Sequence, residues 1–409
     1  MKGASYNMEK LFYGDVTLKE FHADITEMKE IDSNFHVLLN RTAFFPGGGG
    51  QFCDIGNIEN NEVIDVYEQD EKIYHVLENK PAKMHKLKCT IEWDRRWEGM
   101  CDHLGQHILS GCFFKLYNAN TVSFHLGSSS STVDIEGVLD AEKIREVEKF
   151  ANDIIAQNIM VESFVLERKN LKNIKLRRDF VRDDSEIRIV KIGNLDTTAC
   201  CGIHPRNTLG LKVVRIKKYE KYKSNTRIEF LTGERAVNYL ISRDECLNEI
   251  SKHLSSNGDD VIKRIQNTSE KLQQSINKAK EYESKIAEYE AKDMILQAEK
   301  LGKISVVKKI YENSESEYVS KVGAKISEYD DSIALLASVN GNNVNLIFAC
   351  SKLKNIHMGS LLKDAITLMD GKGGGSANFA QGGGRDNGNV QSTLDYAIMK
   401  LKQLCALKD

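Results

Sequence analysis

Two pairs of metal-ligating side chains lie far apart in the sequence but share one spacing. His103 and His107 are four residues apart, and Cys200 and His204 repeat that separation. If residues 102 to 110 form a helix, both imidazoles of the first pair lie on one helix face, roughly 6 Å apart, near enough to share one ion. The sequence therefore predicts a site with four protein ligands, in which the neighbouring Cys201 is the alternative thiolate.

Zinc is the metal that best suits such a ligand set. Neutral imidazoles and a thiolate are typical zinc ligands, whereas magnesium and calcium prefer oxygen. Iron is the less favoured alternative. The ion could take part in a reaction or could only hold two segments together, and the ligand spacing does not separate these two roles.

Composition bounds the class of protein. A chain of 409 residues predicts two or three domains. Nine cysteines without a leading apolar segment favour a reducing compartment, where thiols serve as ligands or core residues. No stretch has the roughly eighteen apolar residues of a membrane helix. We therefore expect a soluble, cytoplasmic protein.

Positive charge is concentrated in two segments of the chain. A net charge of -2 excludes the global basicity of a nonspecific nucleic-acid binder. Two basic runs nevertheless flank the Cys200 cluster, and together they suit an enzyme that reaches a substrate with a phosphate backbone, although either run alone is typical of a solvated face. The runs are Arg168, Lys169, Lys172, Lys175, Arg177, Arg178 and Arg182, and Lys212, Arg215, Lys217, Lys218, Lys221 and Lys223.

The pattern of apolar and turn residues predicts an α+β, multidomain fold with four parts. Residues 1–90 form a β-rich domain, with strands at 34–39 and 63–67. Residues 91–235 form an α+β domain with strands at 121–125 and 131–135 and helices around the histidine pair and over 141–157. Residues 236–300 form a helical hairpin with a break near 255–259, and residues 301–409 form an α/β domain with strands at 331–339 and 344–350.

Two further patterns carry structural expectations. In the second hairpin helix Ile265, Leu272, Ala279 and Ile286 recur every seven residues, which predicts a coiled-coil seam or antiparallel packing. Along the strand at 121–125, alternation places Thr121, Ser123 and His125 on one face, where they could line a pocket or face solvent.

Two glycine-rich segments stand out. Gly47–Gly50 follow Pro46 and precede Gln51, which predicts a fixed loop that lets another chain or a ligand approach closely. Gly371, Gly373–Gly375 and Gly382–Gly384 form the second segment, whose residue order does not match a Walker A loop. Since aromatic and helix-forming residues bracket it, we favour a glycine cradle against a phosphate backbone over a disordered insert.

These motifs in this order resemble the free-standing alanyl-tRNA editing proteins of the long type, which share their modules with alanyl-tRNA synthetase. The resemblance covers essentially the whole chain and is carried by four motifs, Phe44–Gln51, His103–His107, Cys200–His204 and Gly371–Gly375. It implies a glycine-loop domain, a zinc-bearing editing domain and a C-terminal DHHA1-type domain. The implied activity is hydrolysis, in trans, of the ester that joins a wrong amino acid, chiefly serine with glycine as a second candidate, to alanine-specific tRNA.

The resemblance also implies roles for residues. One zinc ion per chain would be bound by His103, His107, Cys200 and His204. Substrate-pocket candidates are Gln106, Ser123 and His125, and candidates for tRNA or substrate binding are Gly48, Gly49, Gly50, Gln51, Lys372, Gly373, Gly374 and Gly375. The partner would be mischarged alanine tRNA, with a homodimer through the C-terminal domain as a further expectation. Leu104 departs from the threonine common in the family, so the amino-acid preference could differ. The alternative hypothesis is a noncatalytic tRNA-binding protein with a structural zinc.

Overall fold

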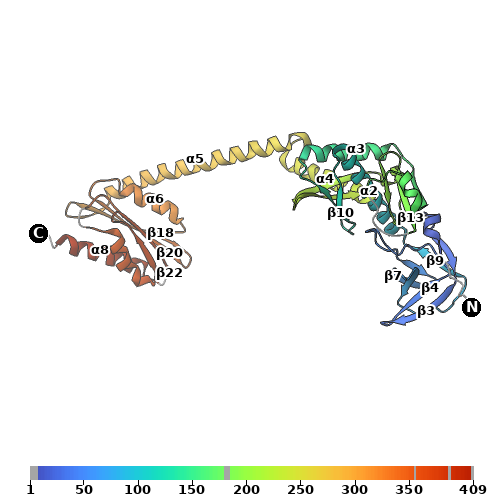
Figure 1. Cartoon of the computed structure of the whole chain (residues 1–409). Coiled ribbons are helices and arrows are strands. Elements are labelled where there is room, and N and C mark those ends of the chain that lie inside the picture. The colour runs from blue at the N-terminus through green and yellow to red at the C-terminus, as the bar shows by residue number, and fades with distance from the viewer. Residues whose placement is uncertain (1–7, 179–184, 354–355, 386–387, 407–409) are drawn as a thin grey trace, which may run out of the picture. The chain divides into compact units, whose positions relative to one another are not determined.

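The chain folds into two compact units that divide between Ile250 and Ser251 (Figure 1). The computed structural model describes residues 8–178, 185–353, 356–385 and 388–406, so that Arg182 of the first basic run lies outside the described residues. Sheets and helices occur in both units, which confirms the predicted α+β, multidomain fold class. Among the described residues, no helix combines the length and apolar character needed to cross a membrane.

An antiparallel sheet of seven strands begins the first unit, in the order β2-β9-β6-β7-β8-β4-β3. Its strands include the two that the sequence predicts at 34–39 and 63–67. One face of the sheet packs on a core that holds Phe44 and Phe45, the residues before the first glycine segment. The elements are β1 (Glu9–Lys10), α1 (Leu11–Gly14), β2 (Glu20–Ala23), β3 (Ile25–Ile31), β4 (Asn34–Leu39), β5 (Arg41–Thr42), β6 (Gly56–Ile58), β7 (Asn61–Gln69), β8 (Lys72–Leu77) and β9 (Leu87–Ile91).

Helix α2 (Trp93–Tyr117) is the central element of the first unit, and every residue from Gly99 to Phe113 is buried. A helix buried on all sides must supply partners for its polar side chains. Asp102 accepts hydrogen bonds from the hydroxyls of Ser131 and Thr232 and forms an ion pair with Arg235. The predicted helix around the histidine pair is therefore present, and it lies where water is excluded.

Two antiparallel sheets, β10-β11-β16-β15 and β12-β13-β14, surround α2 together with helix α3. Asp140 caps α3 by accepting a hydrogen bond from the Lys143 backbone nitrogen. Strand β14 ends at Ala199, and Cys200 is the next residue. The elements are β10 (Thr121–His125), β11 (Ser131–Glu136), α3 (Ala141–Ala156), β12 (Val161–Glu167), β13 (Glu186–Ile192), β14 (Asp196–Ala199), β15 (Val214–Tyr222), β16 (Asn225–Thr232) and α4 (Gly233–Leu254).

The second unit is a three-layer α/β/α domain with a six-stranded sheet in the order β17-β18-β19-β20-β22-β21. Alternate residues of the central strands enter two cores: Ala334 and Leu336 pack with α5 and α6, whereas Ile333 and Leu335 pack with α7 and α8. The elements are α5 (Val261–Leu296), β17 (Glu299–Leu301), β18 (Ile304–Glu312), α6 (Ser316–Ile326), β19 (Ser332–Asn340), β20 (Asn343–Cys350), α7 (Met358–Ile366), β21 (Lys372–Gly375), β22 (Phe379–Arg385) and α8 (Val390–Ala406).

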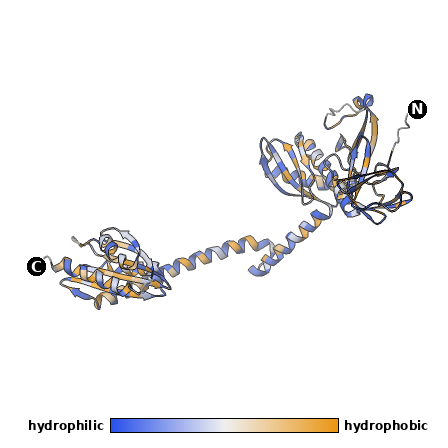
Figure 2. Cartoon of the chain, turned by 90° about the horizontal axis from the view of Figure 1, so that it is seen from below, coloured by the Kyte–Doolittle hydropathy of each residue, from blue (hydrophilic) through white to orange (hydrophobic). Residues whose placement is uncertain are grey.

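The seam predicted on α5 is not a buried seam. Ile265, Leu272 and Ile286 are 46%, 62% and 56% exposed, and apolar residues recur along the length of this helix in Figure 2. The fully buried positions near its C-terminal end are Ala287 and Ala291, which pack against the sheet domain. The seven-residue repeat is therefore present in the helix, but the packing face within the second unit is a different, small-residue stripe. The two helices of the predicted hairpin, α4 and α5, are divided between the units.

The second glycine-rich segment, for which the sequence favours a cradle over a disordered insert, forms two paired strands. β21 and β22 are antiparallel neighbours at one edge of the sheet, with Gly373 opposite Gly382. A Cβ on Gly373 would lie 2.9 Å from the Leu362 side chain of α7, and one on Gly382 would lie 2.5 Å from that of Ile366. Glycine is required here because α7 packs directly on the strand backbone.

Candidate metal centre

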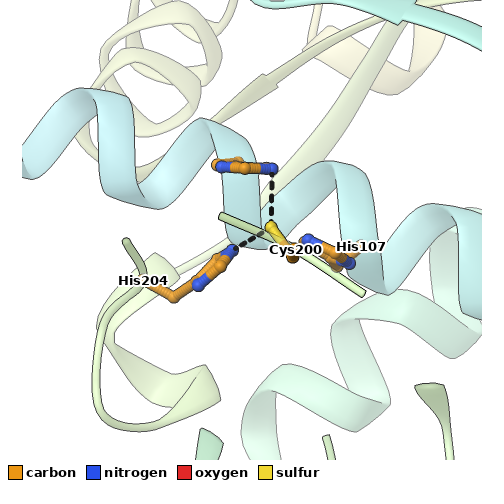
Figure 3. Close-up of side chains that lie close together, drawn as sticks. His107, Cys200 and His204 are labelled. Atoms are coloured by element: carbon orange, nitrogen blue, oxygen red, sulfur yellow. Dashed lines mark hydrogen bonds between the residues drawn. The ribbon is translucent and has the colours of Figure 1, made fainter. Parts of the chain in front are cut away.

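The two predicted ligand pairs meet in one buried cluster. His103 and His107 project from α2, and Cys200 and His204 lie on the loop after β14. Figure 3 shows His107, Cys200 and His204 close together. One ligand atom from each residue lies within 4.8 Å of the ligand atoms of the other three. Cys200 Sγ is 3.5 Å from His103 Nε2 and 3.7 Å from His204 Nε2. Cys201, the alternative thiolate, is exposed and lies outside this cluster.

Electrostatics in the cluster favour a thiolate. Burial raises the pKa of Cys200, but the nearby imidazoles of His103, His204 and His107 outweigh burial and hold that pKa well below its usual range. Burial lowers the pKa of His204 to about 3, so this imidazole is neutral. Burial also lowers the pKa of His107, but the Cys200 thiolate and Asp196 outweigh it and raise the pKa to about 9. Thiolate and neutral imidazole are the protonation states that bind metals, so Cys200 and His204 are already in the binding state, whereas His107 must release a proton when a metal binds.

The outer nitrogens of the α2 histidines are held by acceptors. His107 Nδ1 lies 3.1 Å from Asp196 Oδ2, and His103 Nδ1 lies 3.2 Å from Gln51 Oε1. Arg177 in turn donates from Nε to Asp196 Oδ1 at 2.7 Å. Burial raises the pKa of Asp196, but the hydrogen bond from His107 and the charge of Arg177 outweigh it and lower that pKa below its usual range. These contacts turn both Nε2 atoms toward the cluster centre, as metal-binding histidines require.

The residues fit a zinc ion. His107 Nε2, which faces the cluster, is buried and has no hydrogen-bond partner among the described residues. A buried nitrogen without a partner is costly unless something else satisfies it. Three imidazoles and one thiolate are ligands of the kinds that zinc prefers.

The first glycine segment lies directly against this cluster, and all four glycines have positive φ, from 59° to 134°. Gly48 and Gln51 pair through both backbone hydrogen bonds, so Gly49 and Gly50 form the central positions of a tight turn. A Cβ on Gly49 would lie 3.4 Å from both Cys201 Sγ and His103 Cε1. The predicted fixed loop is therefore observed, and it brings bare backbone beside a metal ligand.

A buried ion pair attaches this loop to α2. Arg96, whose side chain is fully buried, pairs with Asp54 at 2.5 Å. Asp54 also accepts from the backbone nitrogen of Phe45, and Arg96 donates to the carbonyl of Ala43. Both ends of the glycine segment are thus fixed to the helix that carries His103 and His107, although no local sequence signal identified Arg96 or Asp54.

The polar strand β10 does not present its residues as simple alternation predicts. A bulge between Thr121 and Ser123 shifts the register, so Thr121 is buried whereas Ser123 and His125 are exposed. Ser123 donates to Asp134 at 2.6 Å. The strand residue that faces the metal cluster is Phe124, whose ring is 6.1 Å from that of His103.

Phe124 also closes on the glycine loop, because a Cβ on Gly50 would lie 2.6 Å from its ring. It is half-buried, and the sequence pattern of polar side chains on this strand does not point to it. Gln106, the remaining pocket candidate, is buried and donates from Nε2 to Ser110 Oγ, which also accepts from Thr121. The structure therefore brings Gln106 and Thr121 into one buried network and leaves Ser123 and His125 at the surface.

Of the second set of predicted binding residues, Lys372 lies at the surface of the C-terminal domain. It lines a groove of about 940 Å³ together with Asn343, Asn345 and Arg385. Gly373, Gly374 and Gly375 continue along the same edge strand beneath α7.

Two family models match the chain. The DHHA1 domain matches residues 304–403, and the threonyl and alanyl tRNA synthetase second additional domain matches residues 187–229, which include Cys200 and His204. A solved C-Ala domain of alanyl-tRNA synthetase from Aquifex aeolicus covers 26% of this chain and 96% of that chain at 22% identity, but its TM-score of 0.24 is too low to support an inference.

The similar proteins are alanyl-tRNA editing proteins and alanine–tRNA ligases. The chain is 28% identical to the alanyl-tRNA editing protein AlaX-L of Pyrococcus horikoshii, over 97% of this chain and 98% of that protein. It is 30% identical to the alanyl-tRNA editing protein Aarsd1-B of Xenopus laevis, over 60% of this chain and 62% of that protein. It is 28% identical to the alanine–tRNA ligase of Methanococcus aeolicus, over 91% of this chain but only 41% of the ligase. The chain is therefore related, along nearly its whole length, to the free-standing alanyl-tRNA editing proteins of the long type.

Proposed function

We propose that this protein is a zinc-dependent hydrolase that removes serine, and glycine as a second substrate, from mischarged alanine tRNA. The observation that carries the proposal is the buried cluster of His103, His107, Cys200 and His204 beside a glycine loop. Full-length similarity to an alanyl-tRNA editing protein supports it. The proposal concerns cleavage of the ester between the amino acid and the terminal ribose.

The chemical need for such an activity follows from the limits of binding discrimination. A pocket that accepts alanine cannot exclude the smaller glycine by size, and it rejects the added hydroxyl of serine only weakly. A second site that hydrolyses the wrong ester supplies the missing selectivity. In a free-standing protein, that site acts after the synthetase has released the tRNA.

A zinc ion bound by the four residues would supply a positive charge that polarises the ester or orients the amino group of the substrate. Gln51 and Asp196 hold the imidazoles of His103 and His107 in the ligating orientation. Gly49 places bare backbone beside His103, so a substrate can approach the cluster closely.

We also propose the recognition surface for the amino acid. Phe124 forms an apolar wall between Gly50 and His103, and Ser123 and His125 flank it on the same strand. A seryl hydroxyl held by polar groups here would leave those groups unpaired when alanine binds, which lowers the affinity for the correct product. Because Ser123 and His125 are exposed, we propose that they make this contact at the rim of the site.

The tRNA itself is proposed to contact the groove of the C-terminal domain. Lys372 and Arg385 supply two positive charges, and Asn343 and Asn345 supply amide groups that can bind phosphate or sugar. Contacts with phosphate or sugar add affinity but do not recognise the base sequence of the tRNA. Homodimer formation through this domain stays a prediction.

The test is deacylation of Ser-tRNA and Ala-tRNA, both on alanine tRNA, by the wild type and by Cys200→Ala, with bound zinc measured in parallel. We expect the wild type to release serine and spare alanine, and Cys200→Ala to lose both zinc and activity. Cys246→Ala, an exposed cysteine of α4, is the matched control and should keep both. Cys201→Ala tests the choice of thiolate, because it should keep zinc.

Two outcomes contradict the proposal. Serine release by a zinc-free Cys200→Ala protein would exclude the metal from the reaction. Tight tRNA binding by the wild type without loss of either amino acid would support a noncatalytic tRNA-binding protein in which zinc is structural.

A further inference from the structure

Gln51 joins three segments of the chain at one oxygen atom. It follows the four glycines, and its side chain is buried. Its Oε1 lies 3.2 Å from Nδ1 of His103 on α2 and accepts a hydrogen bond of 3.1 Å from the backbone nitrogen of Ile203, inside the Cys200–His204 loop. The glycine loop, the first ligand pair and the second ligand pair therefore meet at this amide.

The orientation of the amide is determined by its partners. The Ile203 nitrogen can only donate, so the atom that faces it must be the Gln51 oxygen and not the amide nitrogen. The same oxygen faces His103 Nδ1, which must then carry the proton. The lone pair of His103 is left on Nε2, the atom that lies 3.5 Å from Cys200 Sγ. Gln51 thus selects the tautomer that can bind a metal.

We propose that Gln51 is a positioning residue of the metal centre and not a residue that binds tRNA. It fixes the ring of His103 and holds the Cys200–His204 loop in register with α2. Metal affinity is consequently coupled to the conformation of the glycine loop, since the loop backbone carries Gln51. The inference rests on the part of the proposed function that assigns zinc to these four ligands.

The test replaces the amide and measures zinc. Gln51→Met keeps the length of the side chain but removes the acceptor, and we expect its Kd for zinc to rise about 10- to 100-fold in competition with a chromophoric chelator. Gln51→Glu keeps an acceptor for both donors and should restore a Kd within about threefold of the wild type. The absorption spectrum of the cobalt-substituted protein should change for Gln51→Met because the His103 ring is released.

Gln106→Met is the matched control. Gln106 is also a buried glutamine and lies on α2 between His103 and His107, but its amide donates to Ser110 and, among the described residues, to none of the candidate ligands. Its replacement should leave the Kd for zinc and the cobalt spectrum as they are in the wild type.

The outcomes separate the alternatives. A Gln51→Met protein with wild-type zinc affinity and cobalt spectrum would overturn the inference, as would an equal loss of zinc in Gln106→Met. If the wild type binds zinc but does not deacylate Ser-tRNA, the proposed activity fails while the role of Gln51 is still decided by the zinc titration.

Discussion

Gly202→Ala should disable the metal centre through a single methyl group. The added Cβ would lie 2.2 Å from both Cε1 and Nδ1 of His103, and 3.1 Å from Gln51 Oε1. Carbon atoms in a packed interior do not approach closer than about 3.4 Å, so the His103 ring and the loop must separate by roughly 1 Å. Because metal–ligand distances tolerate only about 0.2 Å, one ligand is lost.

The expected magnitude follows from the number of ligands. Four-ligand zinc sites bind with roughly 10–16 kcal/mol, so that one ligand contributes about 3 kcal/mol, or roughly 150-fold in Kd. A zinc titration against a chromophoric chelator measures this change directly. Thermal unfolding of the metal-free proteins shows whether the fold itself is altered.

Gly137→Ala is the control for a general effect of adding a methyl group to a glycine. Gly137 has a φ of 85° and no neighbour within 4 Å of the added Cβ. Its replacement should cost about 1–2 kcal/mol of stability through backbone strain and leave zinc affinity unchanged. Zinc binding by Gly202→Ala within threefold of the wild type would refute the reasoning, because the His103 ring would then have room that the structure does not show.

Three other predictions address separate parts of the molecule. Asp196→Asn should raise the Kd for zinc about 10- to 100-fold, since the acceptor behind His107 loses its charge; an unchanged chelator titration would argue against that role. Burial lowers the pKa of His75 to about 4, so the unfolded chain binds more protons than the folded chain between about pH 4 and 6.5, and stability should fall as pH falls through that window. The loss between pH 7 and pH 5 is about 2 kcal/mol, measured by urea unfolding, and His75→Gln should remove it. Replacing Lys372 and Arg385 together by alanine should raise KM for Ser-tRNA with little change in kcat and reduce the salt dependence of tRNA binding by about two charges; unaltered salt dependence would place the tRNA elsewhere.

Local spacing was enough to predict that the four candidate ligands form two pairs, and the structure brings these pairs into one cluster. The four-residue separation in His103 and His107 needs only a helix to bring the rings together, and α2 supplies it. The strands at 34–39, 121–125 and 344–350 are likewise local patterns that the structure contains. In each case the sequence signal itself lies within a few residues, although the partner segment can be distant, as for the strand at 34–39, which pairs with β8.

The supporting contacts could not be predicted in this way. Gln51 meets Ile203 across 152 positions of sequence, and Arg96 meets Asp54 across 42. The bulge in β10 has a different cause, because one extra residue reverses which face each later side chain occupies. It turned Phe124 toward His103 and left Ser123 exposed, although the strand itself was predicted correctly.

The two glycine-rich segments show why composition alone could not assign a role to either. Gly47–Gly50 all have positive φ, and a side chain at Gly49 would meet Cys201 and His103, one of the four candidate ligands. At Gly373 a side chain would instead meet the opposite strand and helix α7. Gly47–Gly50 therefore keep side chains away from the cluster of candidate ligands. The glycines of β21 and β22 instead let α7 pack on the edge of the sheet. A role in binding is accordingly better supported for the first, and in the second it rests on the charges of Lys372 and Arg385 beside the glycines.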